Sequence, residues 1–304
     1  MSKFIMLIGL PGSGKSTYAN KLTSSEKVVK YLSSDKIREE LYGDESIQGN
    51  PNTVFSVLHK RVKDCLRSGY DVVYDATNVT RKNRSSIISQ IKHMCTDGLE
   101  AHIVWAPYQT CVNRDSNRKR CVGEDVIRKF LYRWQSPDYD EGFTNIELVF
   151  NCDIGWNRIR YNDAMITNME IPHDNPHHTL NIAEHCAAAE SYILNKFYND
   201  EDWIILSEAA AFHDIGKPFT KGYKSDENNK LIPIAHYYQH DNVGGYLVYG
   251  CYDDTPECRR RAIEVSWIVC NHMQPYFQSS YYVSMTGRNR DLLDKIHEAD
   301  ISAH

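Results

Sequence analysis

The sequence predicts an α/β domain, a parallel sheet wrapped by helices, followed by an all-α domain. In the first half, short apolar runs alternate with helical patterns, which is typical of a parallel sheet. A glycine-rich segment, Gly9 to Ser16, directly follows the first apolar run. The second half is helical in pattern and rich in histidine, since only His59, His93 and His102 of the 13 histidines precede residue 164. Two domains with two different chemistries are therefore expected.

The composition restricts the classes of protein. At 304 residues the chain is long enough for two domains with ordinary cores. A formal net charge of -5 excludes a global basic field that would hold nucleic acid non-specifically. Nine cysteines without a Cys-x-x-Cys pair fit neither a disulfide framework nor a thiolate zinc site. No charged-then-apolar leader and no membrane-length apolar stretch are present, which predicts a cytoplasmic protein that does not bind membranes.

The predicted elements of the first half alternate in chain order. Strands are expected at 4–8, 28–32, 71–75, 102–106 and 146–150, and helices near 15–23, 35–41, 52–67, 80–93 and 124–134. Ligands of such sheets bind outside the carboxyl ends of the strands. The residues that follow each strand are therefore the candidates for chemistry.

The segment after the first strand has the pattern of a P-loop, which binds a nucleoside triphosphate. Its glycines allow backbone N–H groups to surround a polyphosphate, Lys15 reaches the terminal phosphates, and Ser16 offers a hydroxyl to Mg²⁺. The predicted residues for ATP are Gly12, Ser13, Gly14, Lys15, Ser16 and Thr17.

Carboxylates follow the next two strands. Asp35 and Arg38 lie three residues apart on one helix face; they are either a helix cap and a solvated arginine, or a general base and a ligand for an anionic acceptor. Asp75 either orients Mg²⁺ or caps the following helix. Arg114 and Arg118 are spaced i, i+4 in a basic segment that is a solvated face, a lid over the phosphates, or a surface for a nucleic-acid backbone.

These motifs, in this order, resemble the 5′-hydroxyl polynucleotide kinase branch of the P-loop phosphotransferases over residues 1–152. The resemblance implies that Lys15 and Ser16 bind ATP and Mg²⁺ and that Asp35 is the general base. It also implies that Arg38 contacts the acceptor phosphate and that Arg118, with Arg114, contacts the donor phosphates. Arg120 competes with Arg118 for the lid role because the spacing there is loose.

Potential metal ligands recur through the helical half: His177-His178, His213-Asp214, His240, His272 and Asp300. A single histidine is usually a satisfied core residue, but imidazoles and carboxylates together suit Mn²⁺, Fe²⁺, Co²⁺, Ni²⁺ or Zn²⁺. For His240 and His272, direct phosphate contact is the alternative to metal ligation. Lys217 either stabilises a developing phosphate charge or forms a structural ion pair.

This series resembles the HD phosphohydrolase superfamily, and in particular the HD domains attached to tRNA nucleotidyltransferases. The resemblance implies metal ligation by His178, His213, Asp214 and Asp300, with His240 and His272 as the extra histidines of two-metal members. His177 and His236 are alternatives for the neighbouring positions.

Both resemblances together are similar to bacterial bifunctional end-healing enzymes with the domain order reversed. They imply a kinase domain at 1–152, a connection at 153–168 and an HD domain at 169–304. The implied substrates are RNA or DNA ends bearing a 5′-OH and a 2′,3′-cyclic or terminal phosphate, which a ligase would then join. The alternative interpretations are a nucleoside kinase fused to an HD nucleotidase, and a non-catalytic nucleotide sensor.

Overall fold

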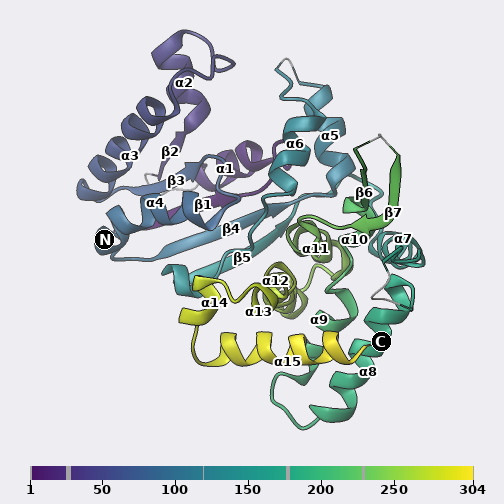
Figure 1. Ribbon diagram of the computed structural model, residues 1–304. Coiled ribbons are helices and arrows are strands. Elements are labelled where there is room, and N and C mark those ends of the chain that lie inside the picture. The colour runs from purple at the N-terminus through teal and green to yellow at the C-terminus, as the bar shows by residue number, and fades with distance from the viewer. Residues whose placement is uncertain (1, 25–28, 119, 176–178, 228–229, 304) are drawn as a thin grey trace. The chain divides into compact units, whose positions relative to one another are not determined.

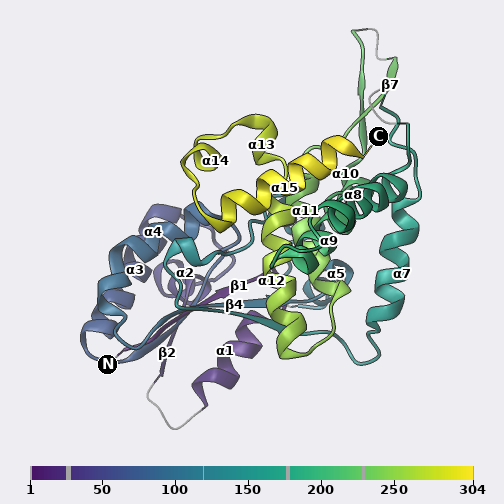
Figure 2. The same cartoon turned by 90° about the horizontal axis from the view of Figure 1, so that it is seen from below.

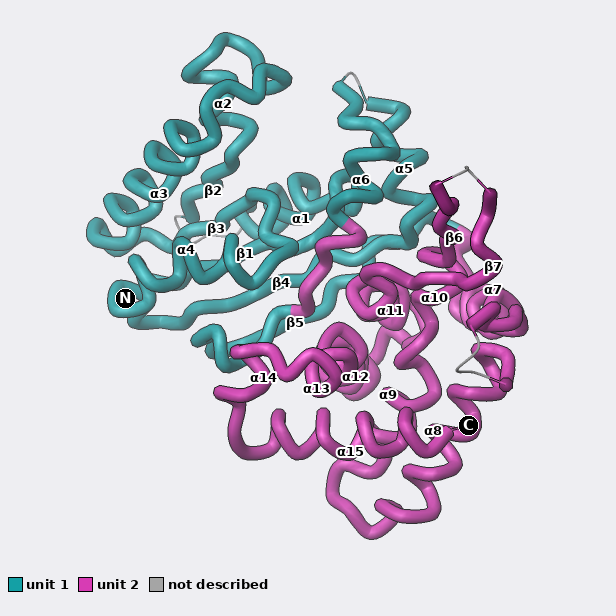
Figure 3. The backbone as a smooth tube through the Cα atoms, viewed as in Figure 1, with its two compact units in different colours: residues 1–130, 137–154 teal, residues 131–136, 155–304 magenta. Residues whose placement is uncertain are grey.

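The computed structural model describes residues 2–24, 29–118, 120–175, 179–227 and 230–303, which form two compact units (Figure 3). Unit 1 comprises residues 1–130 and 137–154, and unit 2 comprises residues 131–136 and 155–304. The domain limits expected from the sequence, near residues 152 and 168, stay predictions.

Unit 1 contains a five-stranded parallel sheet, which confirms the predicted architecture of the N-terminal half (Figure 1). The strands are β1 (Phe4–Ile8), β2 (Val29–Ser33), β3 (Asp71–Asp75), β4 (Leu99–Trp105) and β5 (Asn145–Phe150), in the order β2-β3-β1-β4-β5. Leu7 lies in register with Asp75 on one side and with His102 on the other. Ser33 of β2 also lies in register with Asp75, so the carboxyl ends of β1, β2 and β3 meet at one edge of the sheet, where the predicted site residues follow.

Helices cover both faces of this sheet, with α1 on one face and α3 and α4 on the other (Figure 2). Their bounds are α1 (Lys15–Thr23), α2 (Ser34–Tyr42), α3 (Pro51–Arg67), α4 (Arg81–Ile91), α5 (Tyr108–Ser116) and α6 (Glu124–Leu131). Several starts follow from side-chain caps: Ser33 accepts a hydrogen bond from Lys36 N, and Thr80 accepts one from Asn83 N. A short 3₁₀ turn, η1 (Lys92–Met94), ends the predicted 80–93 helix, and a second, η2 (Tyr139–Glu141), precedes β5.

Acid is expected to destabilise unit 1 through His59, a buried residue of α3. Its Nδ1 accepts from Gln90 Nε2 at 3.4 Å and its Nε2 faces the Tyr74 hydroxyl at 3.2 Å. Burial, aided by the charge of Lys63, lowers the pKa of His59 to about 4. An unfolded histidine titrates near pH 6.5, so the unfolded state gains its proton first as the pH falls. Stability from this residue should therefore be lost between about pH 6.5 and 4, on the order of 2 kcal/mol.

Urea unfolding of the wild type and of His59→Gln at pH 7 and pH 4.5 measures this loss. The variant should lose less stability between the two pH values than the wild type. Equal losses in both proteins would contradict the assignment to His59.

Unit 2 is mainly helical. Its helices are α7 (Arg158–Met169), α8 (Ile182–Lys196), α9 (Trp203–Phe212), α10 (Lys217–Thr220), α11 (His240–Leu247), α12 (Pro256–Asn271), α13 (Gln274–Phe277), α14 (Ser280–Ser284) and α15 (Arg288–Ser302), with the 3₁₀ turn η3 (Val248–Cys251). Helix α8 packs against both α9 and α15, and α12 packs against α9 and α11. Fully buried Ile193, Leu206, Val243 and Ile268 belong to this core.

An antiparallel hairpin in unit 2 corrects the expectation of an all-α domain. Strand β6 (Gly222–Ser225) pairs with β7 (Leu231–His236). The β7 segment Leu-Ile-Pro-Ile-Ala contains two β-branched isoleucines, which favour a strand, and a proline, which disfavours a helix interior. None of the described helices is long and apolar enough to cross a membrane.

Residues 131–136 belong to unit 2 although they separate two parts of unit 1 in the sequence. The fully buried Trp134 ring contacts Tyr246 edge-on, with ring centroids 5.0 Å apart. The Ser136 hydroxyl lies 2.5 Å from the Tyr249 hydroxyl and 2.9 Å from that of Ser266. This segment is therefore an integral part of the hydrophobic core of unit 2.

Candidate functional site

The glycine-rich segment of unit 1 is shaped by backbone conformations and contacts that require glycine. Gly12 and Gly14 have φ values of +82° and +91°. A Cβ on Gly12 would lie 2.2 Å from Cys111 O, and one on Gly14 would lie 1.9 Å from Asn151 Nδ2. Asn151 in turn donates to Ser13 O at 2.7 Å. The loop is thus held between α1 and the residues that follow β4 and β5.

The side chain of Lys15 contacts the backbone of the P-loop. Its Nζ donates to Gly9 O and Leu10 O at 2.8 and 2.9 Å, so the side chain folds over the loop. Burial lowers the pKa of Lys15. The positive charge of Arg118 also lowers this pKa, whereas the negative charges of Asp75 and Asp35 raise it. The predicted base and the predicted lid arginine are therefore both within electrostatic range of this lysine.

The residues predicted for Mg²⁺ are brought together at the sheet edge. Ser16 Oγ donates to Asp75 Oδ2 at 3.0 Å, and Tyr31 donates to the same oxygen at 2.8 Å. A hydroxyl and a carboxylate are oxygen ligands that suit Mg²⁺. Thr17 is exposed on the first turn of α1. Thr80 caps α4, which excludes the capping alternative for Asp75. Ser16 and Asp75 fit the metal of a nucleotide site, and the orienting role of Asp75 stays a prediction.

Asp35 and Arg38 form one cluster at the start of α2. Arg38 Nη1 lies 2.6 Å from Asp35 Oδ1, and Arg120 Nη1 lies 3.5 Å from the same oxygen. Arg38 Nε is buried without a hydrogen-bond partner. An unpaired buried donor beside a half-exposed carboxylate is a place where an anionic ligand would restore a lost hydrogen bond.

Of the arginines predicted to contact phosphate, Arg114 has the best-defined geometry. It pairs with Asp153 at 2.7 Å, and its Nη1 is buried without a hydrogen-bond partner. This nitrogen lies 3.7 Å from the place where a Cβ of Gly14 would be, so it faces the P-loop. Arg118 is exposed one turn further along, and Arg120 turns to Asp35 instead.

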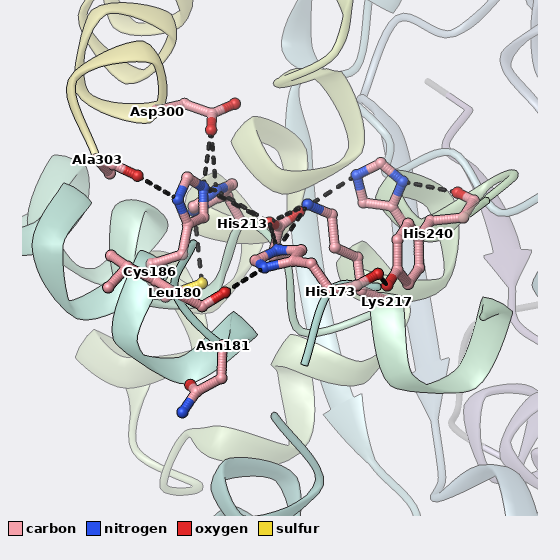
Figure 4. Close-up of polar contacts among 12 residues, drawn as sticks. His173, Leu180, Asn181, Cys186, His213, Lys217, His240, Asp300 and Ala303 are labelled. Carbon is pink, nitrogen blue, oxygen red and sulfur yellow. Dashed lines mark hydrogen bonds and ion pairs between the residues drawn. The ribbon is translucent and has the colours of Figure 1, made fainter. Parts of the chain in front are cut away.

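In unit 2, the structure gathers histidines and aspartates from five helical segments around Asp214, which is almost fully buried. His213 Nε2 lies 3.4 Å and His185 Nε2 3.7 Å from Asp214 Oδ2. Asp300 Oδ1 lies 2.9 Å from His185 Nε2 and 3.5 Å from His213 Nε2, and Figure 4 shows Asp300 above this group. We call His185, His213, Asp214 and Asp300 the first ligand group.

The second ligand group consists of Asp214, His240 and His272. His240 Nε2 and His272 Nε2 lie 3.3 and 3.9 Å from Asp214 Oδ1. Asp214 therefore presents one carboxylate oxygen to each group. Sets of three residues from both groups, His185-His213-Asp214 and Asp214-His240-His272, have geometry suited to a metal ion.

The hydrogen bonds of these imidazoles fix which ring nitrogen faces Asp214. His185, His213, His240 and His272 each direct Nδ1 at a backbone carbonyl, of Ala303, Ala210, Tyr237 and Val269 respectively. A carbonyl oxygen only accepts, so Nδ1 carries the hydrogen and Nε2 of the neutral ring carries a lone pair. The Nε2 atoms of His185 and His213 are 3.2 Å apart, and those of His240 and His272 are 3.1 Å apart. A metal ion, or a proton on one ring of each pair, would remove the repulsion between these lone pairs.

Asp214 also has the electrostatic character of a ligand. Burial alone would raise its pKa, but the neighbouring cations, Lys217 first, hold it well below the usual range. Lys217 Nζ lies 2.6 Å from Asp214 Oδ2 and forms an ion pair with it. Burial lowers the pKa of His272 to about 3, so this imidazole is neutral. An ionised carboxylate beside a neutral imidazole fits a divalent transition metal.

The predicted metal ligands meet this arrangement in different ways. His213, Asp214, His240, His272 and Asp300 come together, whereas His178 and His177 lie outside the described residues, so their roles stay predictions. His185, which the sequence analysis did not single out, contributes to the first group. It follows Glu184, whose side chain forms the capping box of α8 with Asn181. The sequence around His185 therefore signals the start of a helix and not a metal ligand.

His173 is a second residue that the sequence analysis passed over. Its Nδ1 faces Leu180 O at 2.9 Å, which leaves Nε2 to accept from Lys217 Nζ at 3.3 Å. Lys217 thus lies between His173 and Asp214, which agrees with the ion-pair alternative for this lysine. Figure 4 shows the Lys217 side chain directed at His173.

A cavity of about 500 Å³ opens onto the metal-ligand groups. Asp214, Lys217, His240 and Asp300 line it, and its other walls include aromatic and apolar side chains: Tyr237, Tyr238, Met273, Tyr276 and Phe277. Tyr276 donates its hydroxyl to Asp300 Oδ2 at 3.0 Å, which fixes the second oxygen of that carboxylate. The volume is that of a small-molecule site.

Comparison with known proteins characterises the N-terminal half. Residues 4–137 match the family model described as an AAA domain. This match and the five-stranded parallel sheet around Gly9–Ser16 fit a P-loop kinase domain. No curated protein matches the chain.

Several solved structures are similar to part of the chain. A chain of the Pnkp1/Rnl/Hen1 RNA repair complex is 22% identical with a TM-score of 0.37, covering 42% of each chain. A sugar kinase from Janibacter sp. HTCC2649 is 14% identical with a TM-score of 0.38, covering 49% of this chain and 86% of that one. A gluconokinase from Sinorhizobium meliloti 1021 is 15% identical with a TM-score of 0.34, covering 49% of this chain and 82% of that one. The chain thus spans less than half the length of the first of these structures, and none of them assigns a substrate.

Proposed function

We propose that this chain is a bifunctional nucleic-acid end-healing enzyme. Unit 1 would phosphorylate a 5′-OH end with ATP, and unit 2 would be an HD-type phosphohydrolase that removes a 2′,3′-cyclic or terminal phosphate. The observation that carries the second half of the proposal is Asp214, whose two oxygens each face a pair of imidazole lone pairs. The two activities would leave a 5′-phosphate and a 3′-OH, the ends that a ligase joins.

The residues of unit 1 have distinct roles in phosphoryl transfer. Bound ATP and Mg²⁺ would supply the phosphoryl group and neutralise its charge, held by the P-loop, Ser16 and Asp75. Asp35 accepts the proton of the attacking hydroxyl, because it is exposed and, among the described residues, its ion-pair partners are Arg38 and Arg120. The unpaired Arg38 Nε holds the phosphate of the acceptor strand. Arg114 and Arg118 stabilise the charge that develops on the transferred group.

The residues of unit 2 arrange hydrolysis of a phosphoester. A divalent ion at either ligand group would supply a Lewis acid that activates water. The imidazoles keep their Nε2 atoms directed at this position through their backbone hydrogen bonds. Lys217 pairs with Asp214 and His173 and, because it lines the cavity, it would also present a positive charge to the phosphate.

One experiment tests the whole proposal. The purified chain is incubated with ATP, Mg²⁺ or Mn²⁺, and an oligonucleotide with a 5′-OH and a 2′,3′-cyclic phosphate, and both ends are analysed. A free nucleoside is offered in parallel as acceptor. Phosphorylation of the nucleoside but not of the oligonucleotide would contradict a polynucleotide kinase and favour the nucleoside-kinase alternative.

Arg118→Ala is expected to slow the turnover of the kinase reaction by about 10²-fold, since it removes a charge that stabilises the transition state. The phosphohydrolase activity should not change. An arginine that only binds the nucleic-acid backbone would instead raise the oligonucleotide KM and reduce its salt dependence. Recovery of the turnover rate at saturating oligonucleotide would therefore exclude the lid role and transfer it to Arg114, whose unpaired nitrogen faces the P-loop.

A further inference from the structure

The cavity beside the ligand groups is larger and more aromatic than a phosphate requires. A phosphate is bound by positive charges such as that of Lys217, whereas the rings of Tyr238 and Phe277 have no role in binding or hydrolysing a phosphate. Both rings line the cavity, yet they are 59% and 71% exposed. Isolated exposed aromatics are ordinary, but here they gather from two separate segments around one cavity that also contains Asp214 and Lys217.

The ring of Tyr238 is already part of a stack. It lies parallel to the His236 ring, with centroids 4.4 Å apart and an interplanar angle of 26°. His236 also lines the cavity, and Gly222 makes room for it, because a Cβ there would lie 2.7 Å from His236 Cε1. Lys224 Nζ lies 5.6 Å from the centre of the Tyr238 ring. The Tyr238 ring is therefore oriented by its contacts with His236 and Lys224.

The backbone that carries these rings is held in an uncommon conformation. Among the described residues, the non-glycine residues with positive φ are Asp174, Gln239 and Gln278, at 49°, 66° and 46°. Each adjoins a residue that lines the cavity: Asn175, Tyr238 and Phe277 respectively. Such conformations cost free energy and persist where the surrounding structure fixes them, often at ligand sites.

We infer that Tyr238 and Phe277, the aromatic wall of the cavity, bind the base of the terminal nucleotide by stacking. Unit 2 would then recognise nucleotide ends rather than phosphate esters in general. The inference rests on the proposed phosphohydrolase activity and names its substrate class. Stacking on an aromatic ring is tolerant of sequence because every base has a π face. The site should therefore require a base without selecting a particular one.

The test compares two RNA oligonucleotides that differ only at the last position. One ends in an ordinary nucleotide 3′-phosphate and the other in an abasic ribose 3′-phosphate, and both are assayed with Mn²⁺ and the full chain. The wild type should show at least about a 10-fold higher kcat/KM for the first, the effect of losing one stacked base. Tyr238→Ala and Phe277→Ala should each reduce this preference through KM, whereas Tyr238→Phe should keep it.

Tyr198→Ala is the matched control, because this tyrosine is 64% exposed in the same unit but does not line the cavity. Its preference should equal that of the wild type. Equal hydrolysis of the two oligonucleotides by the wild type, or an unchanged preference in both alanine variants, would overturn the inference while leaving the phosphohydrolase intact.

A binding measurement keeps the inference testable if the wild type hydrolyses neither oligonucleotide, a result that would instead refute the proposed activity. Calorimetric titration with a nucleoside 3′-monophosphate and with glycerol phosphate, both with Mn²⁺, reports on the base directly. Tighter binding of the nucleotide that is lost in Tyr238→Ala supports the base site. Equal affinities for the two ligands would overturn it.

Discussion

Asp214→Ala is expected to abolish metal-dependent phosphohydrolysis while phosphorylation of the 5′-OH end continues at the wild-type rate. Asp214 offers one oxygen to each ligand group, so a single substitution removes a ligand from both. Substitution of a residue that hydrogen-bonds to a metal ligand commonly reduces metal affinity or activity by about 10–100-fold. Substitution of Asp214, a ligand shared by both groups, should therefore reduce the activity by more than about 10²-fold. Equilibrium dialysis with Mn²⁺ should show a matching loss of bound metal.

The control for this variant is Asp163→Ala, which removes an exposed aspartate from α7 of the same unit. It should retain both activities and the bound metal. Retained kinase activity in Asp214→Ala reports on unit 1, and circular dichroism reports whether the helices of unit 2 remain folded. Loss of both activities in a folded Asp214→Ala protein would contradict two independent sites.

Asp35→Asn is expected to slow phosphorylation of the 5′-OH end by about 10²- to 10⁴-fold, the usual contribution of a general base. The amide keeps the size of the side chain and an oxygen for Arg38, but it cannot accept the proton of the attacking hydroxyl. ATP affinity should change little, because the P-loop contacts come from other residues. Rates at saturating ATP and oligonucleotide, together with ATP binding, measure the effect.

Glu45→Ala is the matched control for Asp35, since Glu45 is another half-exposed carboxylate near Arg120, at 3.9 Å. If Asp35 acted only by neutralising Arg120, the two variants would have similar defects. Phosphorylation near the wild-type rate in Asp35→Asn would show that another group, or none, removes the proton.

The sequence predicted unit 1 well because its signals are local. Each strand is a short apolar run, and β1 and β3 have the predicted limits. The start of β4 at Leu99 instead of residue 102 depends on pairing with Phe4, which is a long-range contact. In the same way, Ser16 and Asp75 are far apart in the chain and meet only because β1 and β3 are neighbours in register.

The site in unit 2 was only partly predictable, because its ligands come from separate helices. His213-Asp214 is recognisable as an adjacent pair, but His185 has no such neighbour. Its assignment depends on Asp300 and on Ala303 O, which lies 118 positions along the chain. The β6–β7 hairpin was missed for a different reason, since two short strands give little periodic signal. The aromatic wall of the cavity likewise arises from two segments that meet only in the folded unit.

The placement of Trp134 has a consequence for how the protein is synthesised. Residues 131–136 leave the ribosome before the Tyr246, Tyr249 and Ser266 side chains that enclose them, and β5 of unit 1 follows in between. The large apolar ring must therefore wait in water, or in transient contacts, until α11 and α12 have been translated. A separately made fragment of residues 155–304 would therefore lack part of the core of unit 2. Adding the 131–136 peptide in trans should restore what such a fragment lacks.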